Sequence, residues 1–335
     1  MREGPKARKV LVEQRTTRIF RLISDNMIWF ILLSSIVVFS LTVPGFFGAR
    51  NFRNIIHHSV FIGLLAIAES YCLISGNFDL SIESVAGMGA ILSAWLCGAS
   101  VFASGLYVNP FVGLLIVTVI GAAVGFTNGF FILRFKINPF LVTFSTYIII
   151  RGLAVFLTGG RGVSRLPGSF RLVDTIKFLT LPLMVYIMLI FFMFFYFVLE
   201  KTRFGRHTFV IGGNINAAYN FGINVNRHLF RIFVLSGAIS GFTGWLMAAR
   251  AGGATPAMAR GFLFETLAAV VIGGVSITGG FGSLTGVLAG VLLLSSMRSA
   301  LNILAISPFI TEVIRGLLVL AAIVLNSVKR TVGRK

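Results

Sequence analysis

The chain has 335 residues, of which 56% are hydrophobic and only 12% are charged, and its mean hydropathy is +0.94. A soluble domain carries roughly 25% charged residues, so this composition excludes a disordered chain, a disulfide-stapled secreted module and a soluble dinucleotide-binding enzyme, and it indicates a polytopic membrane protein. The net charge of +19 would suggest a nucleic-acid partner in a soluble protein, but membrane proteins concentrate Lys and Arg in cytoplasmic loops, so we expect no nucleic acid.

The first 26 residues form a basic segment with seven Lys and Arg side chains: Arg2, Lys6, Arg8, Lys9, Arg15, Arg18 and Arg21. The apolar run that follows, 27–43, is longer than the hydrophobic region of a signal peptide, and Val43-Pro44-Gly45-Phe46 is not a cleavage site of small residues. We therefore predict a basic cytoplasmic tail over 1–26 and one transmembrane domain over 27–335.

The apolar runs predict an all-α polytopic protein with about ten transmembrane helices, two of them broken or short. The predicted spans are 27–43, 59–75, 84–104, 111–133, 140–158, 181–199, 230–249, 264–279, 284–304 and 309–328. An even number of spans places both termini on the same side. With both termini in the cytoplasm, 18 of the 29 Lys and Arg lie inside, 8 lie outside and 3 lie within spans, which favours this orientation.

Two polar interruptions separate short apolar runs, one at 74–84 and the other at 272–283. Broken helices expose backbone groups that lipid cannot satisfy, so such segments are typical of the lining of a transport path. The candidate path residues are Asn77, Asp79 and Ser81 in the first break, and Gly273, Gly274 and Ser276 in the second. The alternative is that each break is an ordinary polar turn at the membrane surface.

Several spans carry small residues one helical turn apart, which lets helix backbones pack closely. These positions are Gly121, Gly125 and Gly129; Gly237 and Gly241; and Gly282, Gly286 and Gly290. They indicate either a tight bundle or a dimer.

The sequence has no phosphate-binding loop, no H-E-x-x-H motif and no cysteine pair at ligand spacing, so it predicts no catalytic residue, no metal and no cofactor in this chain. Energy for transport must then come from an ion gradient or from a partner. The long loop 200–228 between the sixth and seventh spans would face the cytoplasm. In it, Asn214 can cap a short helix through Ala217 and Ala218, and Gly222 suits the left-handed residue that ends it.

Five stretches occur in one order along most of the chain: 76–81, 157–160, 202–206, 211–225 and 268–274. Together they resemble the ribose-type sugar permeases of bacterial ABC transporters. The resemblance implies a permease in the inner membrane that works as a dimer, with a cytoplasmic ATPase that binds ATP and Mg, and with a periplasmic sugar-binding protein. It also implies that the ATPase docks on the 200–228 loop, at Arg203, Gly205, Gly212, Gly213, Asn214, Ala217, Ala218 and Gly222.

The sequence departs from this family pattern at Asn77-Phe78, at Glu83, at Arg298 and at Glu312, where uncharged or smaller residues are more usual. These departures leave the solute open. Two other functions also remain open. An ion-coupled secondary transporter would use Asp79, Glu69 or Glu83 as coupling carboxylates and would need no ATPase. An intramembrane enzyme would use Asp79 and Glu83 as an acid and base pair and would need no partner at all.

Overall fold

The computed structural model describes residues 27–307, 309–314, 316–317, 320 and 324. The described part of the chain folds mainly into helices. In chain order these are α2 (Met27–Thr42), α3 (Ala49–Ile74), α4 (Ile82–Cys97), α5 (Pro110–Phe135), α6 (Pro139–Thr158), η1 (Gly168–Arg171), α7 (Leu172–Thr175), α8 (Leu183–Lys201), α9 (Arg203–Gly213), α10 (Ile215–Asn220), α11 (Val225–Ala251), α12 (Phe262–Ile272) and α13 (Leu284–Ile303). A two-residue hairpin, β1 (Lys177–Phe178) and β2 (Leu181–Pro182), lies between α7 and α8.

Six of these helices are long and apolar enough to cross a membrane, namely α3, α5, α6, α8, α11 and α13. Three more apolar helices, α2, α4 and α12, are shorter. The predicted all-α multi-pass fold is therefore confirmed. The predicted number of ten spans is not settled, because half of the tenth span, 309–328, lies outside the described residues, as does the whole 1–26 tail.

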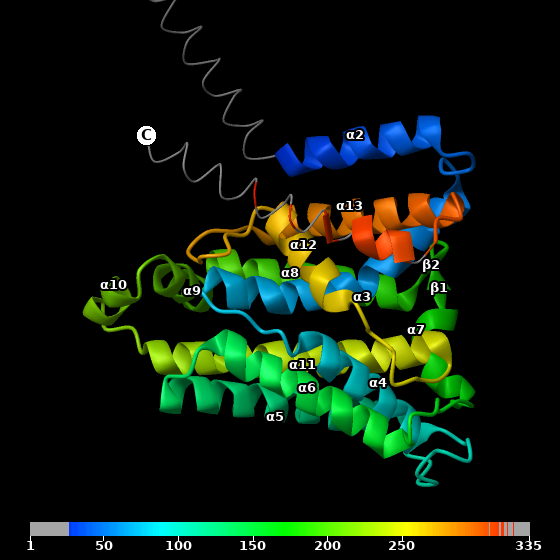
Figure 1. The fold of residues 1–335 in the computed structure, drawn as a ribbon, viewed down its shortest axis with the longest axis horizontal. Helices are drawn as coiled ribbons and strands as arrows, with labels where there is room; N and C mark the ends of the chain where they lie inside the picture. The colour runs from blue at the N-terminus through cyan, green and yellow to red at the C-terminus, as the bar shows by residue number, and fades with distance from the viewer. Residues whose placement is uncertain (1–26, 308, 315, 318–319, 321–323, 325–335) are drawn as a thin grey trace, which may run out of the picture.

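The long helices lie side by side along one direction (Figure 1). Helices α5, α6 and α11 form one side of the bundle, α3 and α8 lie in the middle, and α12, α13 and α2 follow on the other side. Helices α9 and α10 lie at one end of the bundle, whereas α7 and the β1–β2 hairpin lie at the opposite end. The two ends of the bundle therefore carry different elements, and we call them the α10 end and the hairpin end.

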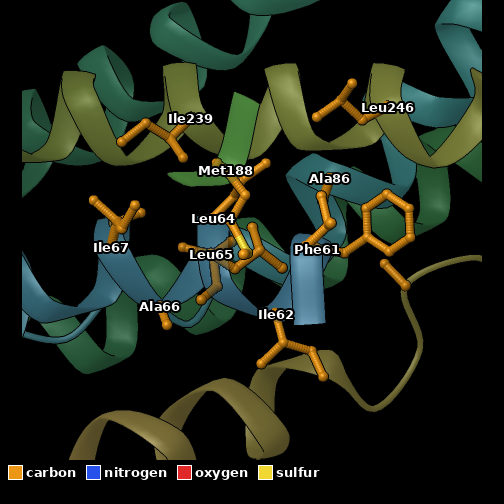
Figure 2. Packing of buried hydrophobic residues seen from close by; sticks show 14 of the residues in the cluster. Phe61, Ile62, Leu64, Leu65, Ala66, Ile67, Ala86, Met188, Ile239 and Leu246 are labelled. Carbon is orange, nitrogen blue, oxygen red and sulfur yellow. The ribbon is translucent and has the colours of Figure 1, made fainter. Parts of the chain in front are cut away.

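Helix α3 is the centre of the core, because its residues from Ser59 to Ile74 are all buried. Figure 2 shows Leu64 and Leu65 of α3 close to Met188 of α8, with Ile239 and Leu246 of α11 on another side. By contrast, only three residues of α6 are buried, Thr143, Ala154 and Thr158. Burying α3 on every side explains why a span with Glu69, Ser70 and Asn51 is tolerated.

The glycine stripes pack within one chain. A Cβ on Gly121 would overlap the carbonyl oxygen of Gly237, and a Cβ on Gly125 would overlap that of Phe233. In the same way Gly286 and Gly290 of α13 lie directly against α12. Of the two interpretations of these stripes, the packing within the chain supports the tight bundle.

Several predicted span limits were wrong, each for a physical reason. Helix α4 ends at Cys97 and not near 104, because Gly98 is extended and begins a loop rich in Gly and Ser. Helix α12 ends at Ile272 and not at 279, because Gly274 takes a left-handed φ of 93°. Helix α3 begins ten residues before the predicted start, where Asn51 is held by Ser299 and by the Phe46 carbonyl.

Candidate translocation and coupling site

The two breaks predicted from the sequence meet in space. The first joins α3 to α4, and the second joins α12 to α13. The backbone N–H of Gly280 donates to the Ile74 carbonyl across 2.8 Å, and a Cβ on Gly279 would lie 2.8 Å from the Cα of Gly76. All three glycines have positive φ, which only glycine adopts readily.

Helix α9 joins the same contact. A Cβ on Gly212 would overlap the Ile74 carbonyl oxygen and would lie 2.6 Å from the Gly280 nitrogen. A Cβ on Gly280 would in turn lie 2.6 Å from the Cα of Gly213. We call Gly76, Gly212, Gly213, Gly279 and Gly280 the glycine junction. It connects the 200–228 segment to both breaks through backbone contact, with no side chain between them.

Asp79 is the centre of a buried polar network. Its Oδ2 accepts from the Ser236 hydroxyl at 2.6 Å, and its Oδ1 accepts from both the backbone N–H and the hydroxyl of Ser81. Asn128 of α5 donates to the Ser81 hydroxyl at 3.0 Å and accepts from Thr146 of α6 at 2.6 Å. One carboxylate thereby ties the first break to α5, α6 and α11, and none of its surface is exposed.

The other predicted path residues lie on both sides of the junction. Asn77 is buried and donates to the carbonyl and hydroxyl of Ser75 at 3.1 Å. Gly273 is packed against Val287 of α13, and Gly274 is exposed. The N–H of Ser276 donates to the Phe281 carbonyl. The structure thus brings the two breaks together at Ile74, Gly76, Gly279 and Gly280, four residues that are not among the six predicted ones.

The predicted Asn214 cap of a short helix is confirmed. The Asn214 side chain accepts from the N–H groups of Asn216 and Ala217, both at 3.0 Å, and Gly222 has a φ of 71° just beyond α10. Sequence reasoning missed α9, which Thr202 caps and in which Gly205 packs on the Leu199 backbone. Arg203 is exposed.

Ala218 was expected on an exposed docking face, but it does not lie on one. It is completely buried in the protein core, and Ala217 is half-buried. The exposed large apolar side chains of this segment are Ile215, Tyr219 and Phe221, with Phe221 79% exposed. A stretch of large apolar side chains that no part of the chain covers is typical of an interaction surface.

Glu83 has a role that its place in the sequence did not show. Its Oε2 accepts from the backbone N–H groups of Gly261 and Leu263 at 3.0 Å, so it caps the start of α12. Its Oε1 lies 3.6 Å from Arg151 and accepts from the Tyr147 hydroxyl at 3.4 Å. The signal was an acidic residue in a predicted span, but its partners are 64 to 180 residues away in the sequence.

Two further charged residues, Arg298 and Glu312, were noted as departures from the family pattern. Arg298 pairs with Glu265 at 3.3 Å, and Glu312 is exposed. In the described part of the chain, no three His, Cys, Asp or Glu side chains come together as metal ligands.

The sequence of this chain is similar to those of known transport proteins. Residues 51–323 match the family model described as "Branched-chain amino acid transport system / permease component". The chain belongs to this permease family. It is 34% identical to the L-arabinose transport system permease protein AraH of Escherichia coli, over 88% of each chain. It is 31% identical to the ribose import permease protein RbsC of Bacillus subtilis, over 88% of this chain and 90% of the relative. It is 32% identical to the galactose/methyl galactoside import permease protein MglC of Haemophilus influenzae, over 92% and 96%.

No solved structure matches the permease. Membership in the family makes the chain a transport subunit of an ABC transporter and not an enzyme, with ATP hydrolysis on a separate subunit. Neither alternative function is supported. Glu69 and Asp79 are fully enclosed, and Glu83 caps a helix, so no pair of these carboxylates is arranged as an acid and base.

Proposed function

We propose that this permease carries a sugar or a related small polar solute into the cell, across the inner membrane, in an importer driven by ATP. The names of its relatives support a sugar, since they specify arabinose, ribose and galactose. The observation that carries the mechanism is the glycine junction, because it joins the 200–228 segment to both helix breaks by backbone contact. Movement of the 200–228 segment would therefore displace both helix breaks directly.

Three kinds of partner follow from this proposal. A cytoplasmic ATPase binds ATP and Mg and hydrolyses the ATP, since the permease sequence has no phosphate-binding loop. A periplasmic sugar-binding protein delivers the solute. A second permease subunit, identical or related, completes the path across the membrane.

The ATPase docking site in this proposal is the segment from Arg203 to Gly222. Asn214 and Gly222 set the ends of α10, while Gly205 and the buried Ala218 anchor the segment from within. The contact itself is made by Ile215, Tyr219 and Phe221. Ala217 and Arg203 lie beside them. Gly212 and Gly213 pass the movement to the breaks.

The docking proposal is tested with the double variant Tyr219→Ala and Phe221→Ala. Loss of aromatic anchors at an interface costs about 2 kcal/mol or more, so ATPase recovered with the tagged permease should fall about tenfold or more, and ATP-driven uptake should fall with it. Phe47→Ala is the matched control, because Phe47 is 76% exposed in the turn before α3, at the hairpin end. Full ATPase recovery with the double variant would exclude this face.

The translocation path in this proposal passes the two breaks. Asn77, Asp79 and Ser81 shape one side of it, and Gly273, Gly274 and Ser276 the other. The exposed Gly274 and the left-handed glycines support a backbone that can move there. Asp79 acts by fixing the break to α11.

The topology that accompanies the proposal has ten spans, with both termini and the α10 end in the cytoplasm. The charge distribution supports it, because Lys201, Arg203, Arg206, Arg227 and Arg231 all lie close to α9 and α10 in sequence.

A further inference from the structure

A non-helical segment, residues 252–261, runs beside α4 between the end of α11 and the start of α12. Near its beginning, Ala254 pairs with Val163, and Gly253 packs on Ser164, whose carbonyl also faces Gly98 at the end of α4. Near its end, the Gly261 N–H donates to Glu83 in the first turn of α4. Because α4 has 16 residues and is about 24 Å long, the segment crosses a large part of the bundle without helical structure.

The end of this segment lies near the middle of the bundle. The Asp79 network places the start of α4 beside Ser236, which is close to the centre of the 27-residue α11. Glu83 lies in this first turn of α4, and the N–H of Gly261 donates to it. Irregular backbone at this depth is tolerated only where protein buries it or where it lines a water-filled cavity.

The exposed side chains of this segment distinguish between burial by protein and the lining of a water-filled cavity. Thr255 and Arg260 are exposed, although they belong to this segment. A guanidinium near the middle of a membrane is costly unless it faces water, a ligand or another protein. Arg260 therefore indicates a polar space along the segment and not contact with lipid tails.

The charges around Arg260 do not balance. Arg151 and Tyr147 of α6 lie near the same point, because both contact Glu83, which also accepts from the N–H of Gly261, the residue after Arg260. Glu83 is the acidic partner of Arg151, but its Oε2 is already occupied by two N–H groups of α12. Among the described residues, no ion pair is formed by Arg260, and neither terminal nitrogen of Arg151 has a hydrogen-bond partner. Two guanidinium groups and the positive end of α12 therefore lie around the Glu83 carboxylate, because Glu265, the acidic residue in the first turn of α12, pairs with Arg298.

We propose that Arg260, with Arg151 and Tyr147, forms a solute site in the permease that receives a carboxylate, so that the transported solute is an acidic sugar such as a uronate. This inference rests on the proposed function and narrows it. Arginine binds carboxylates through two parallel N–H donors, and hydrogen bonds of this kind are stronger than those to a neutral hydroxyl. Arg260 makes the first contact from the exposed side. Arg151 and Tyr147 lie behind it.

The test compares D-galacturonate with D-galactose, which differ only in a carboxylate in place of a CH2OH group. The full-length permease is placed in phosphatidylcholine nanodiscs, and the affinity for each sugar is measured by calorimetry. The galacturonate should bind about tenfold or more tightly than galactose. In Arg260→Gln that preference should disappear, whereas Arg260→Lys should keep part of it. Arg134→Gln, an exposed arginine at the end of α5, is the matched control.

Equal affinity for the two sugars, or an unchanged preference in Arg260→Gln, would overturn the inference. So would loss of galacturonate binding when phosphatidylglycerol replaces phosphatidylcholine, because the site would then hold a lipid headgroup. These failures are separate from failure of the proposed function. A complete transporter that imports neutral sugars with ATP, and whose uptake does not depend on Arg260, refutes the acidic solute but leaves the sugar importer intact.

Discussion

At the scale of single residues, Glu83 connects three helices through one carboxylate. In Glu83→Ala, Arg151 loses its counter-ion, and the N–H groups of Gly261 and Leu263 lose their acceptor. Removing one partner of a buried ion pair costs about 3–5 kcal/mol. We expect the free energy of unfolding of the detergent-purified permease to fall by that amount in denaturant titrations. Arg151→Met in the same chain should recover part of it, and a Glu83→Ala variant as stable as the wild type would contradict the assignment.

Asp79 should affect transport more strongly than membrane insertion. In Asp79→Asn the amide can still accept from Ser81, but its NH2 group cannot accept from the Ser236 hydroxyl. Losing one buried hydrogen bond costs about 1–3 kcal/mol, which leaves the permease folded while loosening the break from α11. Uptake per inserted molecule should therefore fall, as measured against membrane levels on immunoblots. Normal uptake by this variant would mean that the first break is merely a turn.

The sequence predicts the contacts of a residue only where its partners lie a few positions away along the chain. The Asn214 cap was predictable, because its side-chain oxygen accepts from N–H groups that are only two and three residues away. The partners of Glu83 and the burial of Ala218 were not, since both depend on helices far away in the sequence. An acidic residue in a span signals that a partner exists, but it does not say which one.

At the scale of elements, the contact between α5 and α11 depends on glycine. Gly125→Ala would drive a methyl group into the Phe233 carbonyl, and backbone cannot move aside as a side chain can. Overpacking costs about 1–3 kcal/mol, so the unfolding free energy should fall by at least the upper part of that range.

Gly152→Ala on α6 is the matched control, because no atom lies within 4 Å of the added Cβ. Alanine favours a helix over glycine by about 1 kcal/mol in water, so this variant should be neutral or slightly more stable. Equal stability of the two variants would contradict the close packing of α5 on α11.

Hydropathy located most of these elements and failed at two kinds of boundary. It joined the end of α12 to the following loop, because Val275 and Ile277 are apolar although they are not helical. It also shortened α3, because Arg53, His57 and His58 are polar although they are helical. In both cases the backbone conformation was set by tertiary contacts, which a window of sequence does not contain.

At the scale of the whole molecule, the topology can be read from cysteine labelling. The native Cys72 and Cys97 are buried, so they give little background. Cysteines placed at Gly105 and Ser169 should react with a membrane-impermeant maleimide from the periplasm, whereas a cysteine at Asn216 should react only after the membrane is opened. Labelling of residue 216 from the periplasm would refute both the topology and the docking proposal.

The central claim is that movement imposed on the α10 end opens a path for a sugar, and uptake in reconstituted vesicles tests it most directly. Proteoliposomes are prepared with the permease, its ATPase and its binding protein, or with the ATPase left out. Uptake of labelled sugar should require both the ATPase and ATP, and it should persist when ionophores collapse every ion gradient. Uptake by the permease without the ATPase, driven by a proton or sodium gradient, would contradict the account.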